Sequence, residues 1–157
     1  MAILENLPRW LFASVSKHFD DNKQDLALFI EGQYRTTRNI KDFIELRFDG
    51  PDLTEISKGY WKVYTEINVL VQSAMDDENF HRIHTTVGKV VAAFTDIEVY
   101  KYGTGDDDDD SLLGCLVLLA DARSKEKTKV AHFGQIGPDT MLLQASVEGH
   151  YLMHLTI

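Results

Sequence analysis

A run of five consecutive carboxylates is the densest group of chemically active side chains in the sequence. It consists of Asp106, Asp107, Asp108, Asp109 and Asp110. Carboxylate oxygens are the ligands that hard cations such as Ca²⁺ prefer. The spacing of an EF-hand loop is absent, because Ser111 stands where that loop needs glycine and Val117 stands where it needs glutamate. Consecutive side chains of an extended segment also point to opposite sides, so adjacent aspartates make a poor closed cage. We expect a hydrated loop, with contact to a cation or a basic partner as the open alternative.

Histidines form two patterns that could bind a metal ion. His81 and His84 are three residues apart in a predicted helix, whereas the zinc-protease motif needs a spacing of four with an intervening glutamate. We expect His84 to be a half-buried residue at the edge of the apolar stripe of that helix. The pair alone, with no evident third ligand, does not indicate a metal site.

The last predicted strand carries polar side chains on one face. These residues are Gln144, Ser146, Glu148, His150 and His154. Two-residue spacing can bring such groups together in a metal or acid–base site. The same alternation is typical of a strand that turns its polar face to solvent or to a neighbouring subunit, and we favour this second interpretation. A small metal-dependent α+β enzyme that uses Glu148, His150 and His154 stays open as the alternative.

A nucleophile or a phosphate-binding loop is not indicated by the sequence. Cys115 lies within an apolar run, where a thiol is expected to act as a small hydrophobic group. No serine has the Gly-x-Ser-x-Gly pattern. Gly103 and Gly105 precede aspartates, which would repel a phosphate. We therefore expect a protein that is not an enzyme and has no catalytic residue, cofactor or bound metal.

Hydrophobic periodicity predicts one domain over residues 1–157 with an α+β fold, a mostly antiparallel β-sheet with two α-helices packed on one face. The first predicted helix begins at Pro8 and ends in the polar run Asp20–Asp25, and the second covers residues 78–95. The predicted strands cover residues 26–30, 42–48, 60–72, 96–102, 111–122, 129–136 and 142–157. Gly50-Pro51 is expected to end the second strand, and the nearly all-apolar strand 111–122 is expected to be buried on both faces.

The expected core joins the second helix to the longest strand. Val87 and Val91 lie in the apolar stripe of that helix, and Val63, Ile67 and Val69 share one face of the strand. We predict that these two surfaces pack together, because they are the two strongest apolar patterns in the chain.

Charge and cysteine content limit the possible partners. The chain has 157 residues, with 16 basic and 25 acidic side chains and a net charge of −9. This charge argues against broad binding to nucleic acid or to an anionic membrane, although it allows a protein that surrounds DNA without holding it. A single cysteine suits a reducing compartment. No apolar run approaches the ~20 residues that span a bilayer, so we expect no membrane association.

The order of the predicted elements resembles that of the tail-terminator (tail-completion) proteins of long-tailed bacteriophages. The resemblance is carried by the long strand Gly59-Tyr-Trp-Lys-Val-Tyr-Thr-Glu-Ile-Asn-Val-Leu-Val71 with a helix after it, by the segment Glu45-Leu-Arg-Phe-Asp-Gly-Pro51, and by the closing strand Leu142–Ile157. It covers most of the chain in the order of elements and is specific in no single motif.

The resemblance implies a virion protein of the tail or neck, assembled in the host cytoplasm. It implies a homo-oligomeric ring, usually of six subunits, on the head-proximal end of the tail tube, where the ring stops tube polymerisation and contacts the head–tail connector. Its partners would be other copies of itself, the major tail-tube protein and the connector, while DNA passes through without specific binding.

Within such a ring two groups of residues are candidates for contacts. The five aspartates at Asp106–Asp110 would be a channel or partner-contact loop, and the last strand would offer a subunit-contact face. That face consists of Gln144, Glu148, His150 and His154. Another phage neck, collar or baseplate component stays open, and the gene order would distinguish it, because a terminator gene would lie just before the major tail-tube gene.

Overall fold

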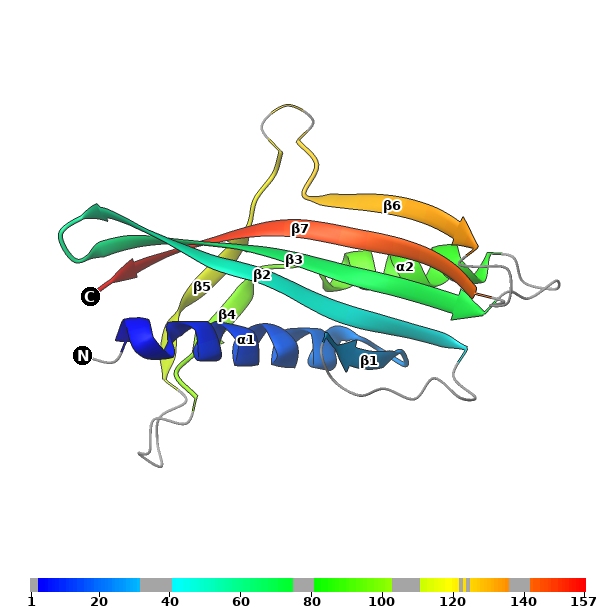
Figure 1. The fold of residues 1–157 in the computed structure, drawn as a ribbon, viewed down its shortest axis with the longest axis horizontal. Helices are drawn as coiled ribbons and strands as arrows, with labels where there is room; N and C mark the ends of the chain where they lie inside the picture. Colours follow the sequence, from blue (N-terminus) through cyan, green and yellow to red (C-terminus); the bar gives the residue numbers. More distant parts are fainter. Residues whose placement is uncertain are drawn as a thin grey trace.

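The computed structural model describes residues 3–31, 41–74, 81–102, 111–121, 123, 125–135 and 142–157. These residues form one helix, three strands, a second helix and four strands, in the order that the sequence predicts (Figure 1). The elements are α1 (Ile3–Asn22), β1 (Ala27–Ile30), β2 (Asp42–Ser57), β3 (Tyr60–Ala74), α2 (Arg82–Ala93), β4 (Ile97–Tyr100), β5 (Leu112–Leu118), β6 (Thr128–Gln135) and β7 (Leu142–Thr156).

One sequence prediction falls outside the described residues, between β4 and β5. It concerns the acidic loop, which was expected to face a channel or to contact a cation or a partner. The loop consists of Asp106, Asp107, Asp108, Asp109 and Asp110. The prediction for these five aspartates therefore stays a prediction.

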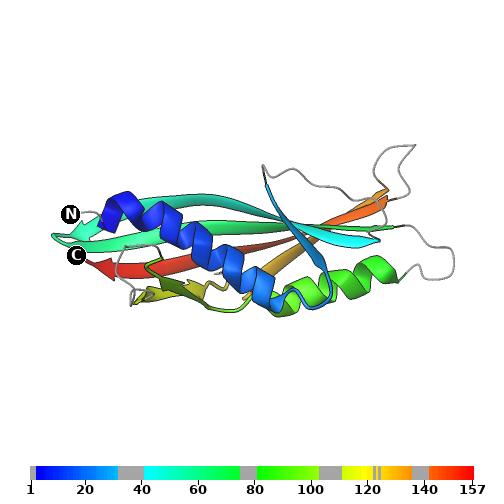
Figure 2. The ribbon, with the colours of Figure 1, turned by 90° about the horizontal axis from the view of Figure 1, so that it is seen from below.

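The strands form a curled sheet in the order β1-β2-β3-β7-β5-β4, and β6 also pairs with β7. Only the β1–β2 pair among these described strands is parallel, so the sheet is mostly antiparallel, as predicted. Both helices pack on one face of it (Figure 2). The outer edge of β7 is divided, because its first half pairs with β6 while Tyr151 and Leu152 pair with β5.

The two longest neighbouring strands, β2 and β3, extend the sheet along its length (Figure 1). The strand predicted at 60–72 is confirmed as β3. The prediction that Gly50-Pro51 ends the second strand is wrong, since β2 continues to Ser57 through a shift in register between Asp49 and Asp52. Gly50 adopts φ +105° there, a conformation open to glycine, and proline is tolerated where a bulge interrupts the ladder of hydrogen bonds.

Helix α1 lies across the inner face of the sheet and is attached to the region of β4 by two polar contacts. The Trp10 indole N–H donates to the Tyr102 carbonyl at 2.9 Å, and the Tyr100 backbone N–H donates to the buried Ser14 hydroxyl at 3.0 Å. The helix begins at Ile3, earlier than Pro8 suggests. Pro8 removes the hydrogen bond to the Leu4 carbonyl, but the earlier start buries Leu7 completely.

Helix α2 packs on the same face through a stripe of apolar residues. Val87 is buried in one cluster with Val63, Ile67 and Val69, as predicted. Val90 is only 2% exposed, whereas Val91 is partly buried at the margin of the cluster. Val90, rather than the predicted Val91, therefore lies at the centre of the contact between α2 and the sheet.

The prediction that the strand at 111–122 is buried on both faces is wrong for β5. Leu116 and Leu118 are buried in the core, but Leu112, Cys115 and Val117 are exposed. In the order of the described strands β5 lies between β7 and β4, and only the face that carries Leu116 and Leu118 is turned to the core. Cys115, expected to act as a small hydrophobic group, is exposed on this strand, and partial burial raises the pKa of its thiol.

Candidate functional site

Polar side chains gather on the face of the sheet opposite the helices, where β3 and β7 run side by side. Alternation places Tyr64, Glu66 and Asn68 on this face of β3, and Glu148 and His150 on the same face of β7. In the antiparallel register Glu66 is opposite His150 and Asn68 is opposite Glu148. The register therefore brings two carboxyl groups and an imidazole together.

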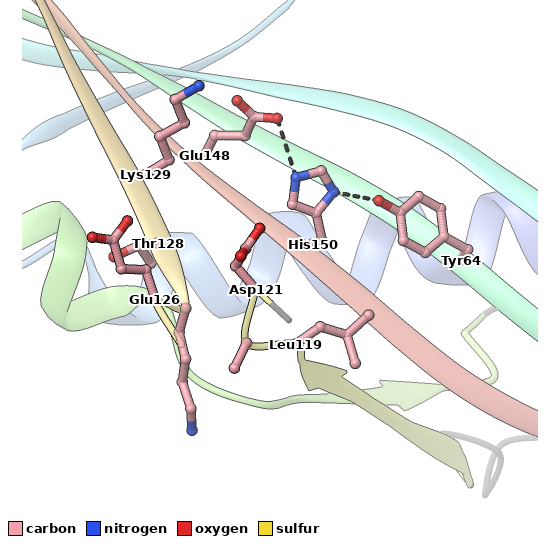
Figure 3. A pocket seen from close by; sticks show the side chains of 10 residues that line it. Tyr64, Leu119, Asp121, Glu126, Thr128, Lys129, Glu148 and His150 are labelled. Atoms are coloured by element: carbon pink, nitrogen blue, oxygen red, sulfur yellow. Dashed lines mark hydrogen bonds and ion pairs between the residues drawn. The ribbon is translucent and has the colours of Figure 1, made fainter. Parts of the chain in front are cut away.

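The distances within this group are short. His150 Nε2 lies 3.3 Å from a Glu148 carboxyl oxygen and 3.9 Å from a Glu66 carboxyl oxygen. On the other side of the ring, Nδ1 is hydrogen-bonded to the Tyr64 hydroxyl (Figure 3). The three donor atoms of Glu66, Glu148 and His150 lie within 4.8 Å of one another. Among the residues that the structure describes, this is the one group of three metal-ligand side chains so close together.

The negative charge of this group changes the proton affinity of its members. A hydrogen bond with Glu148 raises the pKa of Glu66, and partial burial and the charge of Glu148 add to it, while His150 acts in the opposite direction. Partial burial raises the pKa of Tyr64, and the nearby carboxylates of Glu66, Glu148 and Asp52 raise it further. Glu66 thus holds its proton more tightly than an isolated carboxyl group does.

A hollow of about 350 Å³ adjoins the group, between β7 and the segment that leads from β5 to β6 (Figure 3). Glu148, His150 and Tyr64 line it from the sheet, and Asp121, Glu126 and Lys129 are among the residues on the other side. A hydrogen bond of 2.8 Å from the Leu119 N–H to the His150 carbonyl attaches this segment to β7. The Asp121 N–H donates to the Glu126 carbonyl at 2.7 Å and so closes its turn.

The residues predicted as a subunit-contact face are dispersed along β7. Gln144 accepts a hydrogen bond of 3.3 Å from the Gln72 side chain, and only Glu148 and His150 lie in the group with Glu66. His154 is exposed and stacks on the Tyr60 ring at 5.5 Å. The combination of Glu148, His150 and His154 that the enzyme alternative requires is therefore not brought together.

Glu66 and Tyr64 were not predicted as site residues. Alternation in the sequence assigns both to the polar face of the strand at 60–72, and that is the only local signal. Their place beside His150 depends on the pairing of β3 with β7, two strands far apart in the chain.

The other predicted histidine position is corrected by the structure. His84 is exposed rather than half-buried, because the buried stripe of α2 passes through Ile83, Thr86 and Val87. Its ring packs against His132 of β6, with 4.8 Å between the ring centroids. His81 is the exposed N-cap residue of α2.

Two pairs of exposed apolar side chains lie in distant parts of the molecule. At the β2–β3 hairpin Ile56 is 53% exposed, and Ile157, whose N–H donates to the Gly59 carbonyl, is 49% exposed. On β6 Phe133 is 59% exposed and Val130 is 39% exposed. The hairpin forms one end of the long axis, and β6 runs toward the other (Figure 1).

No family model matches the chain, and no curated protein matches its sequence significantly. Within the described residues no helix is long and apolar enough to cross a membrane.

Proposed function

We propose that this chain is the subunit of a hexameric tail-terminator ring of a long-tailed bacteriophage. The ring would cap the head-proximal end of the tail tube, stop its polymerisation and contact the head–tail connector. The proposal begins from the resemblance in the sequence, and the observed order of helices and strands in an α+β fold supports it.

The observation that carries the proposal is the pair of unlike apolar ends. A closed ring needs a head-to-tail interface in which two different surfaces of each subunit meet. The hairpin end offers Ile56 and Ile157, and the β6 end offers Phe133 and Val130 on a strand that, within the described part of the chain, pairs with β7 alone. Large apolar side chains left exposed in this way are typical of surfaces that another protein covers. We therefore infer that the hairpin end of one copy contacts the β6 end of the next.

The charge of the chain is compatible with a DNA channel. A net charge of −9 repels phosphate, so DNA would slide through the ring without being bound. The same charge disfavours the use of the chain as a DNA-binding protein.

Two variants test the head-to-tail arrangement. Ile56→Asp places a charge on the hairpin end and Phe133→Asp places one on the β6 end. Each variant should lose ring formation and sediment as a monomer at a concentration at which the parent chain forms rings. An equal mixture of the two should form dimers and nothing larger, because one intact end of each kind remains available.

Val117→Asp serves as the matched control, since Val117 is an exposed apolar residue of β5 at neither end. It should leave the mass and the ring seen by negative-stain electron microscopy unchanged. Failure of the mixed variants to form dimers, with both still folded by circular dichroism, would contradict the head-to-tail assignment.

A further inference from the structure

We propose that Glu66, Glu148 and His150 form a binding site for a divalent transition-metal ion, with Zn²⁺ as the ion that fits its donors best. Two carboxylate oxygens and one imidazole nitrogen are protein ligands that zinc accepts, and a set of three leaves a fourth position open. This site is independent of the ring proposed above. It also differs from the ligand set that the sequence suggested, because Glu66 replaces His154.

The spacing of the donor atoms fits an ion with little movement. Zinc–oxygen and zinc–nitrogen bonds of about 2.0–2.2 Å in a tetrahedron place neighbouring donor atoms about 3.4 Å apart. His150 Nε2 is already 3.3 Å from Glu148 and 3.9 Å from Glu66. Each side chain is half-buried on a paired strand, so the backbone that carries the ligands is held by the sheet.

Tyr64 orients the imidazole for this role. An Nε2 that binds metal must be unprotonated, so the ring proton must lie on Nδ1. The Tyr64 hydroxyl is hydrogen-bonded to Nδ1, and its oxygen can accept that proton's hydrogen bond. Metal-bound histidines usually donate their second N–H to such a partner, which fixes the ring and increases its basicity.

The charges around the group favour a cation. Two carboxylates lie close together there, and a cation between them neutralises their mutual repulsion. Asp49 is opposite Glu66 on β2 and adds negative charge, whereas Lys129 is opposite Glu148 on β6 and opposes it. Glu148 and His150 also line the hollow, which leaves room for a water or another ligand on the ion.

The imidazole ligand favours a transition-metal ion over Mg²⁺ or Ca²⁺. Mg²⁺ and Ca²⁺ prefer oxygen donors alone, while imidazole suits zinc and its neighbours among the transition metals. We therefore expect Zn²⁺ to bind in the presence of a large excess of Mg²⁺.

The test is titration of the EDTA-stripped full chain with Zn²⁺ alone, by isothermal calorimetry with Mg²⁺ present. One equivalent should bind, and Glu66→Gln, Glu148→Gln and His150→Gln should each weaken binding by about tenfold or more. Tyr64→Phe should weaken it less, because it removes only the partner of a ligand. Circular dichroism melts establish that each variant is folded before it is titrated.

Two matched controls separate this site from chance binding. His154→Gln removes an exposed histidine of β7, and Glu45→Gln removes a half-buried glutamate of β2, both on the face of the sheet that carries the site. Neither substitution should change the affinity. Absence of binding to the parent chain, or equal losses in the controls, would overturn the proposal.

A second readout uses the unmodified chain. In ¹⁵N spectra of the histidine rings, Zn²⁺ should shift one Nε2 signal, which His150→Gln removes and His154→Gln retains. A shift spread over several histidines would show surface binding and would overturn the site.

Discussion

At the scale of single residues, Glu66 is the carboxyl group of the site whose pKa is shifted. A hydrogen bond with Glu148 on the adjacent strand raises that pKa, and His150 and Tyr64 continue the contact (Figure 3). The exposed Asp25 instead forms a simple ion pair with Lys89. Such a surface pair contributes little to stability, whereas the raised pKa of Glu66 makes stability depend on pH.

A pH series on metal-free protein tests the paired glutamates. Because the pKa of Glu66 is raised in the folded chain, the free energy of unfolding should fall as pH rises above the ordinary value of 4.5 and through the raised value. Glu66→Gln should flatten this part of the profile. At neutral pH the substitution should increase the free energy of unfolding by less than about 1 kcal/mol, since solvent screens this side chain.

The measurement is urea unfolding at several pH values, with Glu45→Gln as the control that keeps the slope of the parent chain. A Glu66→Gln profile that parallels the parent over the whole range would contradict the raised pKa of Glu66.

At the scale of elements, the structure depends on the packing of two helices against one face of the sheet, where α2 covers β3 and β7. Gly149 illustrates how close this packing is, because a Cβ added there would lie 2.7 Å from the Phe94 ring. This glycine lies between Glu148 and His150 in β7, so the approach of Phe94 to the inner face positions the strand that carries the site on the outer face. The packing of α2 and the geometry of the site are therefore linked.

A set of substitutions in α2 tests its orientation. Val90→Asp places an unpaired carboxylate in the core and should cost about 3–5 kcal/mol. Val91→Asp should cost less, because Val91 is only partly buried. Ala92→Asp lies on the exposed side and should stay within about 0.5 kcal/mol of the parent. Thermal or urea unfolding measures all three, and equal effects of Val90→Asp and Ala92→Asp would show that the assigned face is wrong.

Much of this architecture follows from patterns that are local in the sequence. Alternation at 60–72 and 142–157 predicted both central strands and the face of each side chain, including Glu148 and His150. The pairing register that adds Glu66 depends on contacts between distant segments, and local periodicity carries no information about it. Continuation of β2 past Gly50 was missed for a similar reason, since pairing with the distant residues of β3 supports it.

At the scale of the whole molecule, the long sheet separates two unlike apolar ends (Figure 1). A strand pair of 15 and 16 residues is longer than a single small core requires, and the hairpin end exposes Ile56 where it extends furthest. In the proposed ring this extension reaches the neighbouring subunit and contacts its β6 end. The metal site on the outer face of β3 and β7 lies between these ends and does not depend on the contact.

The most direct test of the proposed function is a cryo-electron microscopy map of the neck of the virion whose genome encodes this chain. We expect a closed ring of six copies on the head-proximal end of the tail tube, in which the β2–β3 hairpin of each subunit contacts β6 of its neighbour. Isolated copies, a position away from the tail tube, or contacts between identical ends would contradict it.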